Sequence, residues 1–126
     1  MNLVDSSGWL EYLTDAPGAD FFAPAIEDLR QLVVPQICML EVVRKIYREK
    51  GEQPAIQALA QMRQGRMVGL TDSIILSAAR LGLMHRLPLA DSVVLATGRT
   101  YEALVWTQDS DFEGLDGVRY MPKRKA

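Results

Sequence analysis

Short apolar runs alternate with longer amphipathic stretches along the whole chain. The clearest short run is Leu104-Val105-Trp106-Thr107, and an earlier β-like run at 32–34 is stopped by Pro35. Runs of this length and composition, bounded by turn residues or proline, predict β-strands. The five predicted strands lie at 2–5, 32–34, 67–70, 104–107 and 118–121.

Between these runs, apolar residues recur at spacings of three and four, the period of an amphipathic helix. After a cap signal at Asp5-Ser6-Ser7, a first helix is predicted up to the break at Pro17-Gly18. Further helices are predicted over 19–30, 36–50, 53–64, 71–84 and 90–101. The predicted buried face of 36–50 comprises Ile37, Leu40, Val43 and Tyr47, and that of 71–84 comprises Ile75, Leu76, Ala79 and Leu83.

The alternation of strands with helices predicts an α/β fold with a short, mainly parallel sheet. The 126 residues are enough for one compact domain, so residues 1–126 are assigned to a single unit. The last five residues, 122–126, are basic and are expected to form a frayed tail. Ligands of such folds sit beyond the carboxyl ends of the strands, which directs attention to the residues that follow each strand.

Composition removes several classes of chemistry. The chain has one cysteine, Cys38, and one histidine, His85, so cysteine-rich zinc sites and the usual histidine-based metal sites are excluded. Asp and Glu number 16, which leaves carboxylate chemistry open. The lone thiol, the absence of a basic leader at the N-terminus and the lack of a long apolar run favour a reducing cytoplasm.

The net charge of −2 is unlike that of a protein that grips nucleic acid with a broad basic face. Any nucleic-acid contact is therefore expected to be local or mediated by metal ions. The cations of helix 36–50 form either a solvated face or a rim that steers phosphate groups, and they are Arg44, Lys45, Arg48 and Lys50.

Four aspartates stand at element starts or directly after strands, and they are Asp5, Asp91, Asp109 and Asp111. Taken singly, each is explained by helix capping or turn stabilisation, which contributes about 1 kcal/mol. Glu41 has an equally simple explanation as the helix-surface partner of Lys45. However, Glu41 lies in the more apolar half of its helix, which favours a position lining a cleft.

Jointly, these carboxylates suggest a metal site. If the sheet is parallel, the loops that carry the aspartates open at one edge, and the helix after the second strand can bring Glu41 there. Carboxylates that converge in this way repel one another unless a cation neutralises them. Oxygen ligands without histidine or thiolate suit magnesium or manganese, ions that activate water for attack on phosphodiesters.

The ordered set of acidic motifs resembles the PIN domain family and, more narrowly, the VapC-type toxins of toxin–antitoxin pairs. The motifs are Leu-Val-Asp-Ser-Ser at 3–7, Leu-Ala-Asp-Ser-Val-Val-Leu-Ala-Thr-Gly at 89–98 and Thr-Gln-Asp-Ser-Asp-Phe at 107–112. The resemblance covers essentially the whole chain. It implies a Rossmann-like α/β/α sandwich, a metal-dependent endoribonuclease activity, a homodimer and neutralisation by a partner antitoxin. The large side chains of helices 19–30 and 53–64, Phe21 and Phe22 among them, suggest where such a dimer would form.

By position, Asp5, Glu41, Asp91 and Asp109 match the family's acidic quartet and Asp111 its accessory acid. The resemblance also assigns supporting polar roles to Ser6 and Thr107. Asp5 and Asp91 are expected to bind the ion most directly, while Glu41 and Asp109 complete its shell or orient the attacking water. In-line attack by that water would leave a 3′-hydroxyl and a 5′-phosphate.

Three other functions remain open at the level of sequence. The first is an RNA-processing nuclease of the same fold without a toxin role. The second is a phosphoacceptor domain of the receiver type, disfavoured because the segment just after the strand that ends at Thr107 offers no lysine. The third is a non-catalytic module that binds metal or phosphate, disfavoured by the complete acidic quartet.

Overall fold

The computed structural model describes residues 1–125, and within them five parallel strands form one sheet. The strands follow one another across the sheet in the order β3-β2-β1-β4-β5. The α/β class and the parallel sheet predicted from the sequence are therefore confirmed. The strands are β1 (Asn2–Val4), β2 (Leu32–Pro35), β3 (Arg66–Val68), β4 (Leu104–Thr107) and β5 (Val118–Tyr120).

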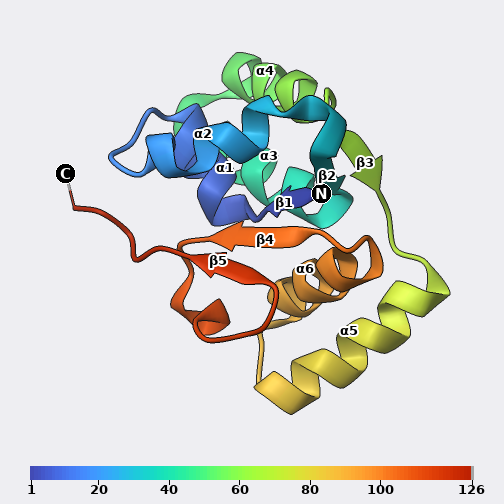
Figure 1. Ribbon diagram of the computed structural model, residues 1–126. Helices are drawn as coiled ribbons and strands as arrows, with labels where there is room; N and C mark the ends of the chain where they lie inside the picture. Colours follow the sequence, from blue (N-terminus) through green and yellow to red (C-terminus); the bar gives the residue numbers. More distant parts are fainter. Residues whose placement is uncertain (126) are drawn as a thin grey trace.

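Six α-helices flank this sheet, and in Figure 1 helices α1 to α4 lie on one side of the strands with α5 and α6 on the other. They are α1 (Ser6–Leu13), α2 (Ala19–Glu27), α3 (Gln36–Lys50), α4 (Glu52–Met62), α5 (Asp72–His85) and α6 (Leu89–Thr100). Two 3-10 turns complete the fold, η1 (Leu29–Gln31) and η2 (Ser110–Phe112). The predicted helix over 19–30 is thus shorter than expected, because regular α-helix ends at Glu27 and the tighter turn η1 follows.

The order of the strands places a topological switch point at the centre of the sheet. From β1 the chain moves outward through β2 to β3, then returns across the other side to β4, the opposite neighbour of β1. Val4 is paired with Trp106, so the residues that follow, Asp5 and Thr107, leave the sheet side by side. The crevice beyond such a switch point is where open α/β sheets bind their ligands.

The core lies between the sheet and its helices. Strand β2 is buried along its whole length, and Trp9, Phe22 and Phe112 are fully shielded from solvent. Phe21 packs edge-on against Phe22, with ring centroids 4.9 Å apart. The aromatic residues of α2 therefore stabilise the interior of the monomer, which does not support the prediction that they form a dimer face.

Helix α3 turns a different face inward from the one predicted. Leu40 and Tyr47 are exposed, whereas the buried residues are Cys38, Met39, Val42 and Ile46. Both sets have helical spacing, so the sequence carries two neighbouring apolar stripes. The buried stripe is the one that the sheet and α4 cover.

The prediction of which α5 residues are buried is also wrong, because the packing partner of the helix selects its buried stripe. This helix packs chiefly against α6 and lies outside it, so only a narrow stripe formed by Ile74, Ala78 and Leu81 is buried. The residues expected inside are at the surface, with Leu76 72% and Leu83 85% exposed. An apolar surface is left on this helix and just beyond it by Ile75, Leu76, Leu83, Met84 and Leu89. It is called the α5 apolar face below.

Within residues 1–125, none of the helices combines the length and the apolar character needed to cross a bilayer. The C-terminal segment after β5 is tied to the body of the protein by Arg124, whose guanidinium contacts Asp20 and the carbonyl of Pro17. The segment expected to fray is therefore held at one point. Residue 126, which belonged to the same prediction, lies outside the described residues.

Candidate active site

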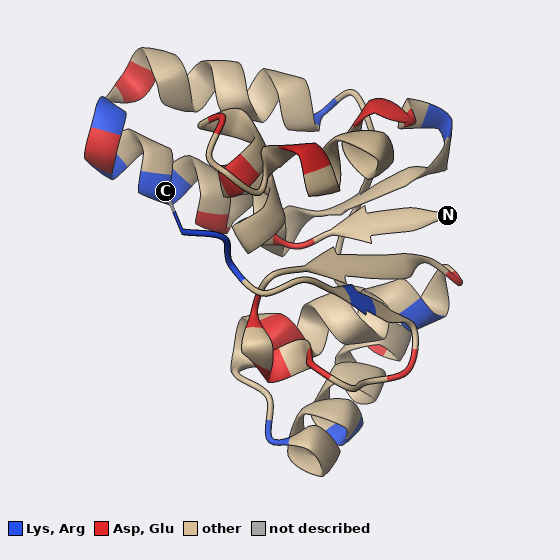
Figure 2. Cartoon of the chain, turned by 60° about the vertical axis from the view of Figure 1, so that its left-hand side comes forward, with Lys and Arg blue, Asp and Glu red and all other residues tan. Residues whose placement is uncertain are grey.

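The carboxyl ends of β1 and β4 and the start of α6 bring acidic side chains together at the switch point. One carboxylate oxygen from each of Asp91, Asp109 and Asp111 lies within 4.8 Å of the others. Asp91 is in the first turn of α6, Asp109 follows β4, and Asp111 is in η2. In Figure 2 the turn after β4 shows the red of acidic residues.

Asp5 lies behind this group in the protein interior, where only 3% of its surface is exposed. Its Oδ1 accepts hydrogen bonds from the hydroxyl of Ser7 at 2.7 Å and from the backbone N–H of Gly8 at 3.0 Å. Its Oδ2 accepts a hydrogen bond from the hydroxyl of Thr107 at 2.6 Å. Three donors from two elements therefore fix the orientation of this carboxylate.

Thr107 links Asp5 to the acidic group. The same hydroxyl that donates to Asp5 accepts a hydrogen bond from the backbone N–H of Asp109 at 2.9 Å. Asp109 in turn accepts from the backbone N–H of Asp111 at 2.9 Å, which fixes the turn η2. The predicted supporting residue Thr107 is fully buried at the centre of this network.

Glu41 lies on α3, the helix that also carries the buried Cys38. The pKa of the buried Cys38 thiol is raised, chiefly by burial and further by the negative charges of Asp5, Glu41 and Asp91. The three acids are therefore near enough to Cys38 for their charges to act on its thiol. Glu41 itself is half-buried, and it is not one of the three acids whose oxygens meet within 4.8 Å.

Two of these carboxyl groups have raised pKa values, and nearby negative charges contribute to both shifts. Burial raises the pKa of Asp5 from an ordinary value of 3.8 to about 6, despite the hydrogen bonds from Thr107 and Ser7 that lower it. The pKa of Asp91 is raised to about 7, chiefly by burial and in addition by the negative charges of Asp109, Asp5 and Asp111. A cation at this position would relieve that repulsion.

Capping accounts for part of the arrangement but not for all of it. Asp5 is the N-cap of α1 and Asp109 caps η2, as the simpler reading of these residues predicts. Asp91 has no such role, because the residue at the N-cap position of α6 is Pro88. A carboxylate in the first turn of a helix is normally stabilised in its charged form, yet the pKa of Asp91 is raised. The proximity of Asp91 to the other acids is therefore what needs a functional explanation.

Two polar contributions were missed from the sequence. On the α1 side, the hydroxyl that donates to Asp5 belongs to Ser7, the neighbour of the predicted Ser6. The Asp-x-Ser spacing at a helix start was the available signal. Glu11 is buried in α1 and accepts hydrogen bonds from the side chain of Gln108 and the backbone of Gly18. Its position among apolar residues of α1 gave no indication of this contact.

A model of the PIN domain family matches residues 3–118. The chain belongs to the PIN domain family. No curated protein matches it. A PIN domain with oxygen-only donors at the switch point has the ligand chemistry that hard divalent cations such as Mg²⁺ and Mn²⁺ prefer.

Solved structures share this PIN fold over nearly the whole chain. A toxin–antitoxin complex from Klebsiella pneumoniae aligns with a TM-score of 0.79 at 21% identity, covering 94% of this chain and 96% of the other. VapC20 of Mycobacterium tuberculosis, described as a toxin that cleaves the sarcin–ricin loop, aligns with a TM-score of 0.76 at 19% identity, covering 94% and 99%. VapBC2 from Rickettsia felis, bound to promoter DNA, aligns with a TM-score of 0.72 at 9% identity, covering 96% and 97%.

The raised pKa values predict how stability varies with pH in the absence of metal. The unfolded chain releases these two protons near pH 4, whereas folded Asp5 and Asp91 hold theirs up to about pH 6 and 7. The metal-free protein is therefore expected to lose stability as the pH rises from about 4 to 7. The buried Asp5 alone accounts for about 3 kcal/mol of this loss, and Asp91 adds a further amount that its solvent exposure reduces.

Urea unfolding in EDTA at several pH values measures this dependence. The Asp91→Asn variant is the control, since it should lose a large part of the pH dependence while keeping the fold. A wild-type protein that is more stable at alkaline than at mildly acidic pH would contradict the assigned environment of these carboxylates.

Proposed function

We propose that this chain is an endoribonuclease that depends on Mg²⁺ or Mn²⁺ and acts as the toxin of a toxin–antitoxin pair in the cytoplasm. The observation that carries the proposal is the meeting of Asp91, Asp109 and Asp111 within 4.8 Å beside buried Asp5, at the switch point of a PIN domain. The descriptions of the similar structures from Klebsiella pneumoniae and Mycobacterium tuberculosis support the toxin role.

Each acidic side chain has a role that follows from its position. Asp91, Asp109 and Asp111 are placed to hold the ion together. Asp5, fixed by Ser7 and Thr107, adds negative charge behind them and keeps the β4 loop in register through Thr107. Its burial, which raises its pKa, makes direct coordination dependent on displacing a proton.

A bound divalent ion would lower the pKa of a coordinated water and neutralise charge on the scissile phosphate. The proposed role of Glu41, which lies on α3, is to orient that water and accept its proton. With the 3′ oxygen as the leaving group, this attack breaks the P–O3′ bond and leaves a 3′-hydroxyl and a 5′-phosphate. No 2′,3′-cyclic phosphate forms, because the attacking oxygen comes from water and not from the ribose.

Cleavage of RNA tests the proposed activity. Purified protein is expected to cut RNA in Mg²⁺ or Mn²⁺, to stop when EDTA is added, and to resume when the ion is restored in excess. The reason is that the carboxylates alone supply no positive charge to the phosphate. Cleavage that continues unchanged in EDTA would contradict the proposal.

An antitoxin and a second copy of the chain are the proposed protein partners. The antitoxin is expected to be encoded beside this gene, as the toxin role implies. For the dimer, the structure offers a surface other than the one expected from helices 19–30 and 53–64. The α5 apolar face exposes large side chains that a monomer leaves in water, among them Leu83 at 85% and Leu89 at 86% exposure.

Light scattering is expected to give about twice the chain mass at micromolar concentration. Leu83→Lys should shift the protein to the monomer, since a charge in an apolar interface opposes association while the exposed position leaves the monomer stable. The matched control is Ile56→Lys, which should remain dimeric. Ile56 lies on α4 and is 51% exposed. A monomeric wild type, or dissociation by Ile56→Lys alone, would contradict this assignment.

A further inference from the structure

A second hollow with very different charge lies next to the acidic site. It is a groove of about 650 Å³ between α1, α3 and the C-terminal segment. Figure 2 shows the C-terminal segment in the blue of basic residues, ending beside a helix that carries further basic positions. The cations that line the groove are Lys45, Lys50, Lys123, Arg124 and Lys125.

These five cations are a large share of the positive charge of the chain, which has 14 lysines and arginines and a net charge of −2. The two acids in the same lining offset these cations only in part. Glu11 is buried and already accepts hydrogen bonds from Gly18 and Gln108, and Glu49 lies 3.8 Å from Arg48. Among the described residues, the four lysines of the groove have no carboxylate within 4.0 Å.

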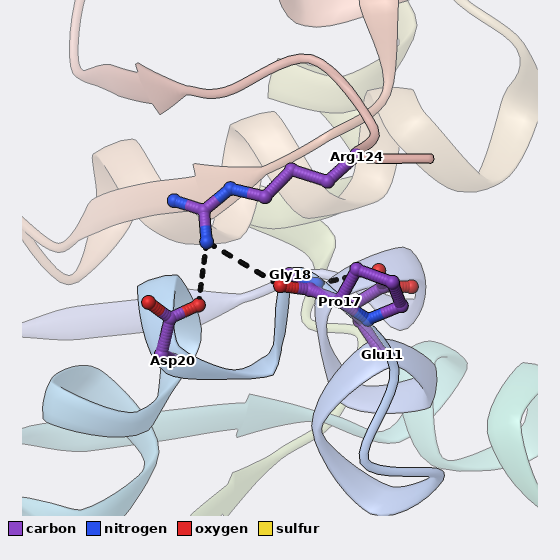
Figure 3. Close-up of polar contacts among 5 residues, drawn as sticks. All are labelled: Glu11, Pro17, Gly18, Asp20 and Arg124. Atoms are coloured by element: carbon purple, nitrogen blue, oxygen red, sulfur yellow. Dashed lines mark hydrogen bonds and ion pairs between the residues drawn. The ribbon is translucent and has the colours of Figure 1, made fainter. Parts of the chain in front are cut away.

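Arg124 holds the basic segment in place along the groove (Figure 3). Its Nη1 donates to Asp20 Oδ1 at 2.6 Å and to the carbonyl oxygen of Pro17 at 3.3 Å. Both acceptors belong to the connection between α1 and α2 or to the start of α2. With Arg124 anchored, its neighbours Lys123 and Lys125 remain free to present charge to a ligand.

Two walls of the groove carry residues that neighbour the acidic site. Lys45 is four residues after Glu41 on α3, so both side chains lie on the same face of the helix about 6 Å apart. On the opposite wall, Glu11 is hydrogen-bonded to Gln108, the residue that precedes Asp109. Both walls of the groove therefore lead toward the acidic group.

We propose that this groove holds the phosphate backbone of the single RNA strand that enters the acidic site. The inference rests on the proposed nuclease function and names how its substrate is held. A site made of carboxylates repels phosphodiesters, and a net charge of −2 gives no general attraction, so affinity requires cations close to the site. The apolar floor formed by Leu10, Ala16, Pro17 and Ile46 can accept sugar and base faces between the phosphates.

RNA binding in EDTA separates this groove from the cleavage chemistry. The probe is a fluorescein-labelled single-stranded RNA of about 16 nucleotides, titrated at several salt concentrations. The groove variant carries Lys45→Gln and Lys125→Gln, and the matched control carries Arg30→Gln and Arg63→Gln, two exposed cations outside the groove. Both variants change the net charge by the same amount.

Each phosphate contact adds about 0.7 to the slope of log K against log salt for a single strand, so losing two should lower the slope by about 1.4. At about 0.1 M salt this corresponds to an affinity about 25-fold weaker for the groove variant, with the control close to wild type. Equal affinities and slopes for the two variants, or no RNA binding by wild type, would overturn the proposal. If the groove variant does not fold, the single variants Lys45→Gln and Lys125→Gln are each expected to lower the slope by about 0.7.

Two further arms distinguish the possible failures. In the first arm, polyglutamate of similar length represents an acidic protein segment. A groove variant that loses affinity for polyglutamate but keeps its affinity for RNA would assign the groove to a protein ligand and overturn the RNA proposal. Cleavage is measured in parallel with Mg²⁺. If the wild type binds RNA through the groove but does not cleave it, the nuclease function is refuted and the groove proposal stands. If the wild type cleaves RNA and the groove variant binds RNA as tightly as the wild type, the groove proposal alone is refuted.

Discussion

Replacing Asp91 or Asp5 by asparagine is expected to reduce RNA cleavage by at least about 100-fold, the usual cost of removing one key electrostatic group from an active site. Asparagine is nearly the same size as aspartate, so the fold should survive either change. Asp91→Asn removes one of the three carboxylates that meet within 4.8 Å. Asp5→Asn removes the buried charge to which Ser7, Gly8 and Thr107 donate.

Asp28→Asn is the matched control for this pair, because Asp28 is exposed at the end of α2, away from the acidic group. It should cleave at the wild-type rate. Initial rates of cleavage of a fluorescent RNA in excess Mg²⁺ measure all three variants. If the Asp5→Asn and Asp91→Asn proteins are folded and cleave RNA as fast as Asp28→Asn, the acidic group has no part in the mechanism.

Metal-free Asp91→Asn is expected to melt at or above the temperature of the wild type at about pH 8. At that pH the wild-type site holds Asp91 charged beside Asp109, Asp5 and Asp111, the charges that raise its pKa. Neutralising Asp91 relieves this repulsion, worth about 1 kcal/mol after solvent screening, or about 3–5 °C for a chain of this size.

If Asp91 only stabilises the first turn of α6, the Asp91→Asn change should lower the melting temperature instead. There the negative charge would interact favourably with the helix dipole, and its loss would lower stability by about 0.3–1 kcal/mol. Differential scanning fluorimetry in EDTA distinguishes the two, with Asp28→Asn as the reference. A clear fall in the melting temperature of Asp91→Asn would show that Asp91 is a structural residue of its helix.

The order of elements and the edge that carries the site were predictable from the sequence because local patterns determine both. Strands β1 and β4 are short apolar runs, and Asp5 and Asp109 follow them directly. Once the sheet is parallel, the carboxyl ends of neighbouring strands share one edge. The register of Val4 with Trp106 then brings the two acidic loops together, although that register is a tertiary property.

The faces of the helices could not be predicted in the same way. Helices α3 and α5 carry apolar residues around more than half of their circumference, so more than one stripe has the correct period. The neighbour decides which stripe is buried. For α5 that neighbour is chiefly α6 and not the sheet, which leaves Leu76 and Leu83 in solvent.

Long-range polar contacts were also beyond the reach of sequence patterns. The anchoring of Arg124 by Asp20 joins residues 104 positions apart, and nothing near either residue signals the other. The same holds for Glu11 and Gln108, which are 97 positions apart. The contact between Ser7 and Asp5 is different, since it is local and follows a known capping pattern.

The effect of Mg²⁺ on the melting temperature of wild type and of Asp91→Asn tests most directly whether the acidic group is a metal site. An ion that binds the folded site and scarcely binds the unfolded chain raises the melting temperature progressively with its concentration. The predicted result is a clear rise for wild type and a much smaller one for Asp91→Asn, which lacks one ligand. No rise in wild type with millimolar Mg²⁺ or Mn²⁺, or an equal rise in both proteins, would contradict a metal centre at Asp91, Asp109 and Asp111.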